Sequence, residues 1–193
     1  MPIPFSCEVR YHFAMGWTAP TAPGTWFPLL ALAIAGACAG ATGQAGAREG
    51  SVGDAATILD ELDRHGDVTV EITTGVEHFA KGLVTLTVGG DGHVTVLNLR
   101  SGTRQEFPAH LEPTAVRELG HELAVAGFAR LEKKPGPREP GDSPVVLRLL
   151  QGTTALVEKH LWYADRYDDK GLEKVLARYE AMVSKVTGGQ LPY

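Results

Sequence analysis

The stretch Leu83–Arg100, LVTLTVGGDGHVTVLNLR, decides the fold. Apolar residues alternate with threonines before the four residues GGDG at 89–92, and the alternation resumes after them. A period of two is typical of a strand that buries one face. Glycine and Asp-Gly tolerate the positive φ angles that tight hairpin turns need. The stretch therefore predicts two antiparallel strands, Leu83–Val88 and His93–Arg100, joined by a hairpin turn.

Further strands are predicted on both sides of this hairpin. Residues 68–73 alternate between branched apolar and polar side chains, so a strand precedes it. Nearer the C-terminus, residues 145–150 and 153–163 flank a Gln-Gly turn and predict a second hairpin. A short additional strand is expected at residues 129–132.

Three helices are predicted, because apolar residues recur at helical spacing between residues that cap helix ends. The expected helices are Asp54–His65, a second that begins at Leu111-Glu112-Pro113 and stops at Gly127, and a third from Asp168 or Asp169 to Gly188. Proline suits the first turn of a helix, where its missing N–H costs little.

The predicted elements follow one another in the order α-βββ-α-ββ-α. Tight turns between consecutive strands favour an antiparallel sheet, and a single apolar stripe on each helix favours packing against one face of that sheet. We therefore predict an α+β fold with helices packed on one face. The single domain is expected at residues 67–187, after a flexible tether and short helix at 40–66 and before a tail at 188–193.

The composition is ordinary for a globular protein, since 44% of the 193 residues are hydrophobic and 21% are charged. The formal net charge is -5, with acidic and basic residues interspersed along the chain. Nucleic-acid binding needs a basic surface that neutralises phosphates. Nucleic acid is therefore not an expected partner.

An uncharged apolar run at Leu29–Ala37, followed by small residues, predicts an export signal over residues 1–39. The run is shorter than the roughly 20 residues of a membrane-spanning helix. Two processing sites fit: Ala-Cys-Ala at 37–39 suits an ordinary signal peptidase, whereas residues 34–38 resemble a bacterial lipobox that would lipidate Cys38. The protein is expected in the cell envelope or outside the cell, touching a membrane only through that lipid. The plainer alternatives are a buried apolar helix and a misassigned start codon, with Met15 as the other candidate start.

The sequence contains no complete motif for catalysis or for metal or cofactor binding. The His-Glu pair at 121–122 begins a zinc-peptidase pattern, but Val125 stands where the second histidine would be. Ser143 lacks the glycine-rich surroundings of a strand-to-helix nucleophile. Cys7 and Cys38 both precede the domain, which excludes thiol catalysis and cysteine-bound zinc within it. We expect no enzymatic activity, no cofactor and no metal.

Two segments are candidates for binding a partner. Residues 160–167 carry three aromatic side chains at a strand end, and such residues are enriched in binding sites. The proline-rich loop Lys133–Pro144 has restricted backbone freedom, so a partner that holds it removes little entropy. The plainer interpretations are aromatics that cover the edge of the core and a solvated connection. The expected binding residues are Pro137, Pro140, His160, Trp162, Tyr163 and Asp165.

The order of segments from Val68 to Val186 resembles a known family. A strand that ends in EITTG at 71–75 is followed by a proline-started helix that ends in AGF at 126–128, a polar loop, a hairpin and a closing helix. This order is similar to that of the emfourin family of thermolysin-type protease inhibitors and of uncharacterised bacterial lipoprotein domains. The resemblance implies a protease as partner, and it assigns no inhibitory residue.

The function expected from the sequence is that of a secreted or lipid-anchored, non-catalytic binding domain. One alternative is an inhibitor of an extracellular thermolysin-type metalloprotease, and another is a hydrolase that uses histidine and aspartate side chains. A hydrolase would gather several such side chains in one concave pocket. The candidates for such a cluster are His78, His93, His110, His121, His160, Asp165 and Asp168.

Overall fold

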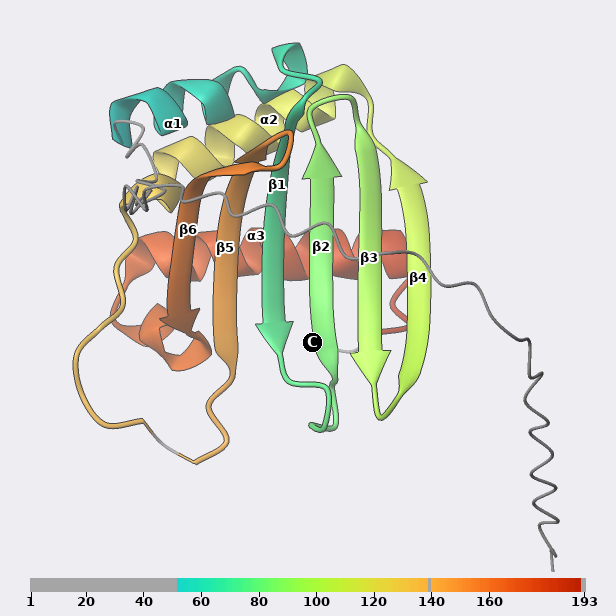
Figure 1. Ribbon diagram of the computed structural model, residues 1–193, viewed down its shortest axis with the longest axis vertical. Coiled ribbons are helices and arrows are strands. Elements are labelled where there is room, and N and C mark those ends of the chain that lie inside the picture. Colours follow the sequence, from blue (N-terminus) through green and yellow to red (C-terminus); the bar gives the residue numbers. More distant parts are fainter. Residues whose placement is uncertain (1–51, 139, 192–193) are drawn as a thin grey trace, which may run out of the picture. The chain divides into compact units, whose positions relative to one another are not determined.

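The computed structural model describes residues 52–138 and 140–191, and it confirms the predicted α+β fold (Figure 1). Six antiparallel strands form one sheet in the order β4-β3-β2-β1-β5-β6. The strands are β1 (Val68–Gly75), β2 (Leu83–Gly89), β3 (His93–Arg100), β4 (Thr103–His110), β5 (Pro144–Gln151) and β6 (Thr154–Trp162). The predicted export signal, Cys38 and the tether up to residue 51 lie outside the described residues.

Three α-helices and three short 3-10 helices complete the described chain. They are α1 (Val52–Asp60), η1 (Leu62–Arg64), α2 (Pro113–Val125), η2 (Phe128–Arg130), η3 (Tyr163–Tyr167) and α3 (Lys170–Thr187). None of the described helices combines the length and the apolar character that crossing a membrane requires.

The helices cover one face of the sheet. In Figure 1, α2 and α3 both lie behind the strands, and α1 packs beside α2. Along β1, every second residue from Val68 to Thr74 is buried, while the residues between them are partly exposed. The strands β2, β3 and β5 alternate in the same way. Burial of one face explains the period of two in the sequence, and we call the opposite face of the sheet the open face.

The core between sheet and helices contains the whole side chain of Tyr179 from α3, including its polar end. The Tyr179 hydroxyl donates a hydrogen bond to the carbonyl oxygen of Val84 at 3.1 Å. It also lies 2.9 Å from the hydroxyl of Thr74. A buried hydroxyl is costly unless it is hydrogen-bonded. These two contacts therefore fix α3 against β1 and β2.

The expected order of elements was one strand short, because β4 was not predicted. β4 pairs with β3 from end to end and lies at the edge of the sheet. Most of its side chains are exposed, so the strand shows no apolar alternation in the sequence. Pro108 is tolerated there, since an edge strand needs hydrogen-bond donors on one side only. The turn before it, Ser101-Gly102, has two positive φ angles, as in a tight hairpin.

Two smaller expectations also differ from the structure. The prediction of a strand at residues 129–132 was wrong, because the chain forms η2 up to Arg130 and continues from there as a loop. The helix predicted at 54–65 breaks after Asp60 and continues as η1. That segment contributes Ala55, Leu59 and Leu62 to the core, so the packed domain begins before the predicted boundary at residue 67.

Gly120 allows α1 to lie directly against α2. A methyl group at Gly120 would overlap the carbonyl oxygen of Leu59 and would lie 2.9 Å from Cβ of Leu62. The contact is therefore made between backbones, and any side chain at this position would push the two helices apart.

We predict that Gly120→Ala lowers the free energy of unfolding by about 1–3 kcal/mol, as overpacking of a core does. In an exposed helix the same change would stabilise the protein, because alanine favours helices by about 1 kcal/mol over glycine. Urea unfolding followed by circular dichroism measures the difference. Gly66→Ala is the control, since nothing lies within 4 Å of a methyl group there. Equal stabilities of the two variants would contradict the close contact.

Candidate binding site at one end of the sheet

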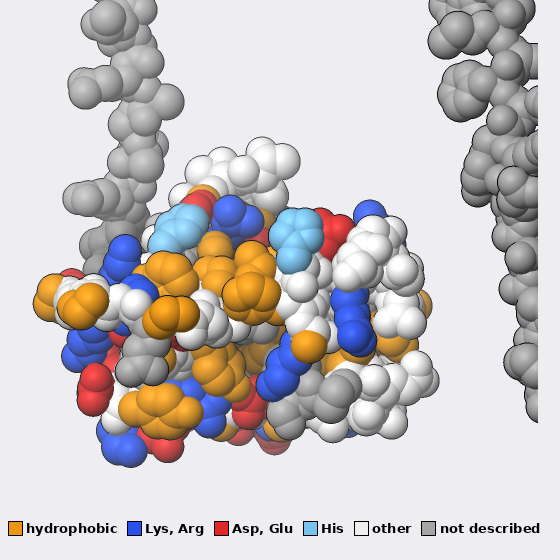
Figure 2. Space-filling model, turned by 90° about the horizontal axis from the view of Figure 1, so that it is seen from below, with side chains coloured by type: hydrophobic (Ala, Val, Ile, Leu, Met, Phe, Trp, Pro, Cys, Tyr) orange, Lys and Arg blue, Asp and Glu red, His pale blue; other side chains and the backbone are white. Residues whose placement is uncertain are grey.

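The two segments predicted to bind a partner meet at one end of the sheet. The proline-rich loop that precedes β5 and the segment that follows β6 lie at the lower end in Figure 1, together with the loop between β1 and β2. A hollow of about 460 Å³ lies between these segments. We call it the strand-end pocket, and its walls include Phe79, Ala80, Gly141, Ser143 and Tyr163. Figure 2 looks at this end and shows hydrophobic side chains gathered near its middle, with charged side chains around them.

The loop between β1 and β2 forms one wall of the pocket and is held close to the sheet. The N–H of Phe79 donates to the carbonyl oxygen of Val76 at 3.0 Å, and the N–H of Gly82 donates to the carbonyl oxygen of Phe79 at 2.9 Å. Gly82 has a φ of 79°, and a Cβ there would lie 2.6 Å from the carbonyl oxygen of Leu99. The loop therefore presents Phe79 at the pocket rim, where its side chain is 43% exposed.

Arg138 fastens the proline-rich loop to the segment after β6. Its Nη1 donates to Oδ1 of Asp165 at 2.6 Å, and Asp165 is only 3% exposed. The guanidinium also lies over the ring of Trp162, at 5.6 Å from the centroid, and donates to the carbonyl oxygen of Lys134. A carboxylate buried to this extent needs such a partner. The pair therefore holds the loop against the fold.

Two further hydrogen bonds fix the end of the same loop. The N–H of Ala164 donates to Oδ1 of Asp142 at 3.1 Å, and the N–H of Tyr163 donates to the carbonyl oxygen of Ser143 at 2.9 Å. The loop is thus attached at Arg138, Asp142 and Ser143, and Pro140 restricts the backbone between Arg138 and Asp142. A surface ordered before binding loses less entropy when a partner arrives.

Tyr163 forms the opposite wall, and a network of charged groups sets its orientation. Its hydroxyl donates to Glu180 of α3, while Nη1 of Arg166 donates to the Tyr163 hydroxyl at 2.7 Å and to Glu180 at 2.8 Å. Burial and the hydrogen bond to Glu180 raise the pKa of Tyr163 to about 12. The phenol stays protonated at neutral pH, so it acts as a fixed donor and leaves its ring to line the pocket.

The predicted binding residues have different environments. Pro137 and Pro140 are exposed on the loop, and Trp162 is half-buried beneath Arg138. Tyr163 is the one residue of the predicted set that lines the strand-end pocket. Asp165 is buried and paired, so it positions the loop.

His160 lies apart from this pocket, on the open face of the sheet. Its Nε2 is 2.7 Å from Oε1 of Glu158, which also contacts Arg148. Hydrogen bonds from Arg148 and then from His160 lower the pKa of Glu158. His160 therefore belongs to a surface ion-pair network.

The histidines and aspartates that could have formed a hydrolytic centre are spread over the molecule. Nδ1 of His121 lies 2.6 Å from Oδ1 of Asp60 on the helical layer, and Asp168 is exposed after η3. His93 and His110 lie side by side on neighbouring strands, away from His121 and Asp168. Within the described ranges, no group of three or more histidine, cysteine, aspartate and glutamate side chains is arranged to hold a metal ion.

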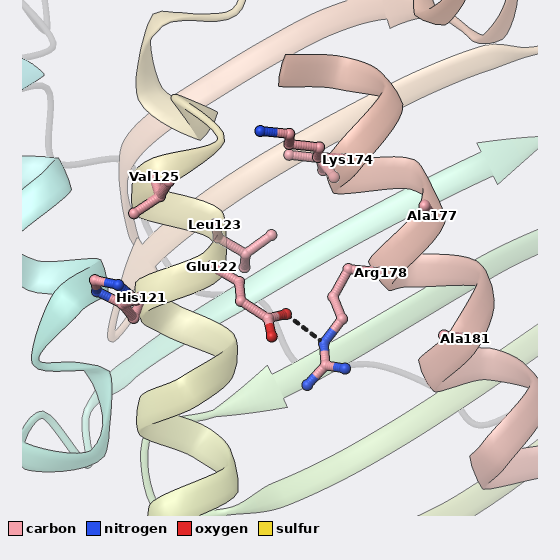
Figure 3. Close-up of a pocket in the computed structure, with 9 residues that line it drawn as sticks. His121, Glu122, Leu123, Val125, Lys174, Ala177, Arg178 and Ala181 are labelled. Atoms are coloured by element: carbon pink, nitrogen blue, oxygen red, sulfur yellow. Dashed lines mark ion pairs between the residues drawn. The ribbon is translucent and has the colours of Figure 1, made fainter. Parts of the chain in front are cut away.

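A second hollow, also of about 460 Å³, lies between α2 and α3 (Figure 3). Its walls are mostly apolar, from Leu123, Val175 and the 64%-exposed Val125, and the Glu122–Arg178 ion pair of 2.9 Å spans it. His121 also lies at the wall of this hollow, and its ring is directed toward α1, where Nδ1 contacts Asp60. No local pattern in the sequence predicts this groove, because it arises from the packing of two helices. The same holds for the wall of the strand-end pocket that the β1–β2 loop forms.

No protein-family model and no curated protein matches this chain. The function of the strand-end pocket therefore has to be inferred from its own geometry.

We predict that Asp165→Ala lowers the free energy of unfolding by about 3 kcal/mol, because breaking one partner of a buried ion pair leaves the other uncompensated. The loop should also become a substrate for trypsin at Arg138, which limited proteolysis detects. Lys170→Ala is the matched control, since it breaks an exposed ion pair with Glu173, and exposed pairs contribute little to stability. A loop that stays resistant in Asp165→Ala would contradict the anchoring role of this pair.

Proposed function

We propose that the protein is an exported, non-catalytic binding domain that holds an apolar side chain of a protein partner in the strand-end pocket. The observation that carries the proposal is the fixed position of both pocket walls. Arg138 and Asp165 hold the proline-rich loop, while the turn hydrogen bonds around Phe79 hold the β1–β2 loop. A pocket between two ordered loops requires little reorganisation when it is filled.

The size and lining of the pocket suit this occupant. Its volume of about 460 Å³ falls within the range of small-ligand sites, roughly 300–1,000 Å³. Phe79 and Tyr163 offer aromatic surface, and Lys81 and Ser143 add polar groups at the wall. Aromatic residues in partly enclosed pockets contribute much of the energy in protein interfaces. One aromatic or branched side chain from a partner fits these properties.

The two alternatives receive different support. A rigid, exposed loop beside a pocket favours inhibition of a thermolysin-type metalloprotease among the alternatives. In that case the bound protein partner would be the protease. The hydrolase alternative has less support, since the seven histidine and aspartate candidates do not meet in one described pocket. The raised pKa of Tyr163 also makes that group a poor general base at neutral pH.

We predict that N-acetyl-phenylalanine amide and N-acetyl-leucine amide bind the pocket with millimolar affinity, a range typical of fragments of this size. Amide NMR signals of Gly75, Gly82 and Tyr163 should shift as either compound is added. Phe79→Ala should weaken the binding at least roughly fivefold, about 1 kcal/mol, because it removes one aromatic wall.

Tyr167→Ala is the matched control for that experiment. Tyr167 is 76% exposed and does not line the pocket, so its removal should leave the affinity unchanged. Equal effects of the two variants, or shifts confined to other parts of the sheet, would reject the pocket as the site. Adding the same proteins to a thermolysin peptide-cleavage assay tests the narrower alternative. Inhibition by the wild-type chain that Phe79→Ala relieves would establish it, and full protease activity would exclude it.

Export of the protein gives a separate prediction about residues 1–39. Mass spectrometry of the protein isolated from the cells that naturally produce it should find a new N-terminus, either after Ala39 or at a lipid-modified Cys38. Cys38→Ser should release the protein from the membrane fraction in the lipid-modified case and change nothing in the other. A chain that keeps residues 1–39 intact would contradict export and leave the binding experiment unaffected.

A further inference from the structure

His93 and His110 form a pair that the sequence does not reveal. His93 is the first residue of β3 and lies directly opposite His110, the last residue of β4. Both side chains are exposed on the open face. Their ring centroids are 5.5 Å apart, with the ring planes at 76°. Opposite residues of antiparallel strands have Cβ atoms about 4.5–5.5 Å apart. The pairing of the strands therefore keeps these two imidazoles together.

The backbone around the pair is held in place by the neighbouring turn. The N–H of His93 donates to Oδ1 of Asp91 at 3.0 Å, and the N–H of Leu111 donates to the carbonyl oxygen of Gly92 at 2.9 Å. A Cβ at Gly92 would lie 2.9 Å from Cε1 and 3.2 Å from Nε2 of His110. The missing side chain at Gly92 thus leaves the space that the His110 ring occupies.

The pair differs from the other paired histidines of the described chain in its partners. His121 and His160 each direct a ring nitrogen at a carboxylate, Asp60 and Glu158 respectively. The ring nitrogens of His93 and His110 have no hydrogen-bond or ion-pair partner among the described residues. In each neutral imidazole one ring nitrogen carries the proton, and the other keeps a lone pair available to a ligand.

We propose that His93 and His110 together bind one divalent transition-metal ion, with water completing its coordination. Neutral imidazole is the protein ligand that copper, nickel and zinc ions share, with metal–nitrogen distances of about 2.0–2.1 Å. Small rotations about the side-chain bonds bring one nitrogen of each ring to such an ion, since the rings are exposed and not packed into the core. Magnesium and calcium ions are excluded, because they prefer oxygen ligands.

Affinity should follow the general order of these ions for nitrogen sites, with copper above nickel. Two protein ligands make an open site, so exchange is fast and the bound ion retains positions for water or for a ligand from another molecule. The site is independent of the strand-end pocket, which lies at the opposite end of β1 and β2.

Nickel ion is the probe of choice for the full chain, because it binds imidazole without oxidising the thiols of Cys7 and Cys38 as copper would. Added to nitrogen-15-labelled protein at pH 7.5, paramagnetic Ni²⁺ should broaden the amide signals around His93 and His110. His93→Ala and His110→Ala should each weaken this local binding roughly tenfold or more. The unchanged remainder of each spectrum shows that the variant is folded.

His121→Ala and His160→Ala are matched controls, since both remove an exposed histidine from a different part of the molecule. They should leave the broadening at β3 and β4 unchanged, and Mg²⁺ should cause none. The proposal is overturned if millimolar Ni²⁺ leaves these signals sharp. It is also overturned if the broadening persists in His110→Ala, or if the control variants reduce it equally.

Discussion

The pairing of β1 with a neighbour on each side is the constraint on which the rest of the structure depends. β1 joins the hairpin unit to β5, a strand from the other half of the domain. Tyr179 of α3 hydrogen-bonds to both β1 and β2 from within the core, so the position of the helix is set by these two strands. β4 pairs with β3 and β6 pairs with β5, so these two strands form the edges of the sheet.

The strand-end pocket illustrates how a site arises from elements that are distant in sequence. The loop after β1, the proline-rich loop before β5 and the segment after β6 share one end of the sheet because the three strands lie side by side. The buried Asp165 then fixes Arg138, and with it the loop. Rigidity here comes from one buried charge pair and a few hydrogen bonds to the backbone, which hold the pocket walls in place.

The edge strand β4 has a different role, because most of its side chains face solvent and stabilise little. Its structural role is to place its own side chains beside those of β3. An edge strand exposes charged and polar groups that discourage pairing with other chains, and Pro108 removes one donor from the edge. The same strand brings His110 opposite His93, so an edge element that adds only the partly buried Phe107 and Ala109 to the core creates the pair to which we assign metal binding.

The sequence by itself determined the local elements with strong periodicity and clear ends. The Leu83–Arg100 hairpin and the stop at Gly127 follow from turn and capping chemistry that acts over a few residues, whereas the structure chose Asp169 over Asp168 as the cap of α3. Only the tertiary structure decided that β4 exists, that Asp165 is a buried anchor, and that His93 meets His110. These features depend on pairing partners far along the chain, and an exposed edge strand or a solitary aspartate carries no periodic signal of its partner.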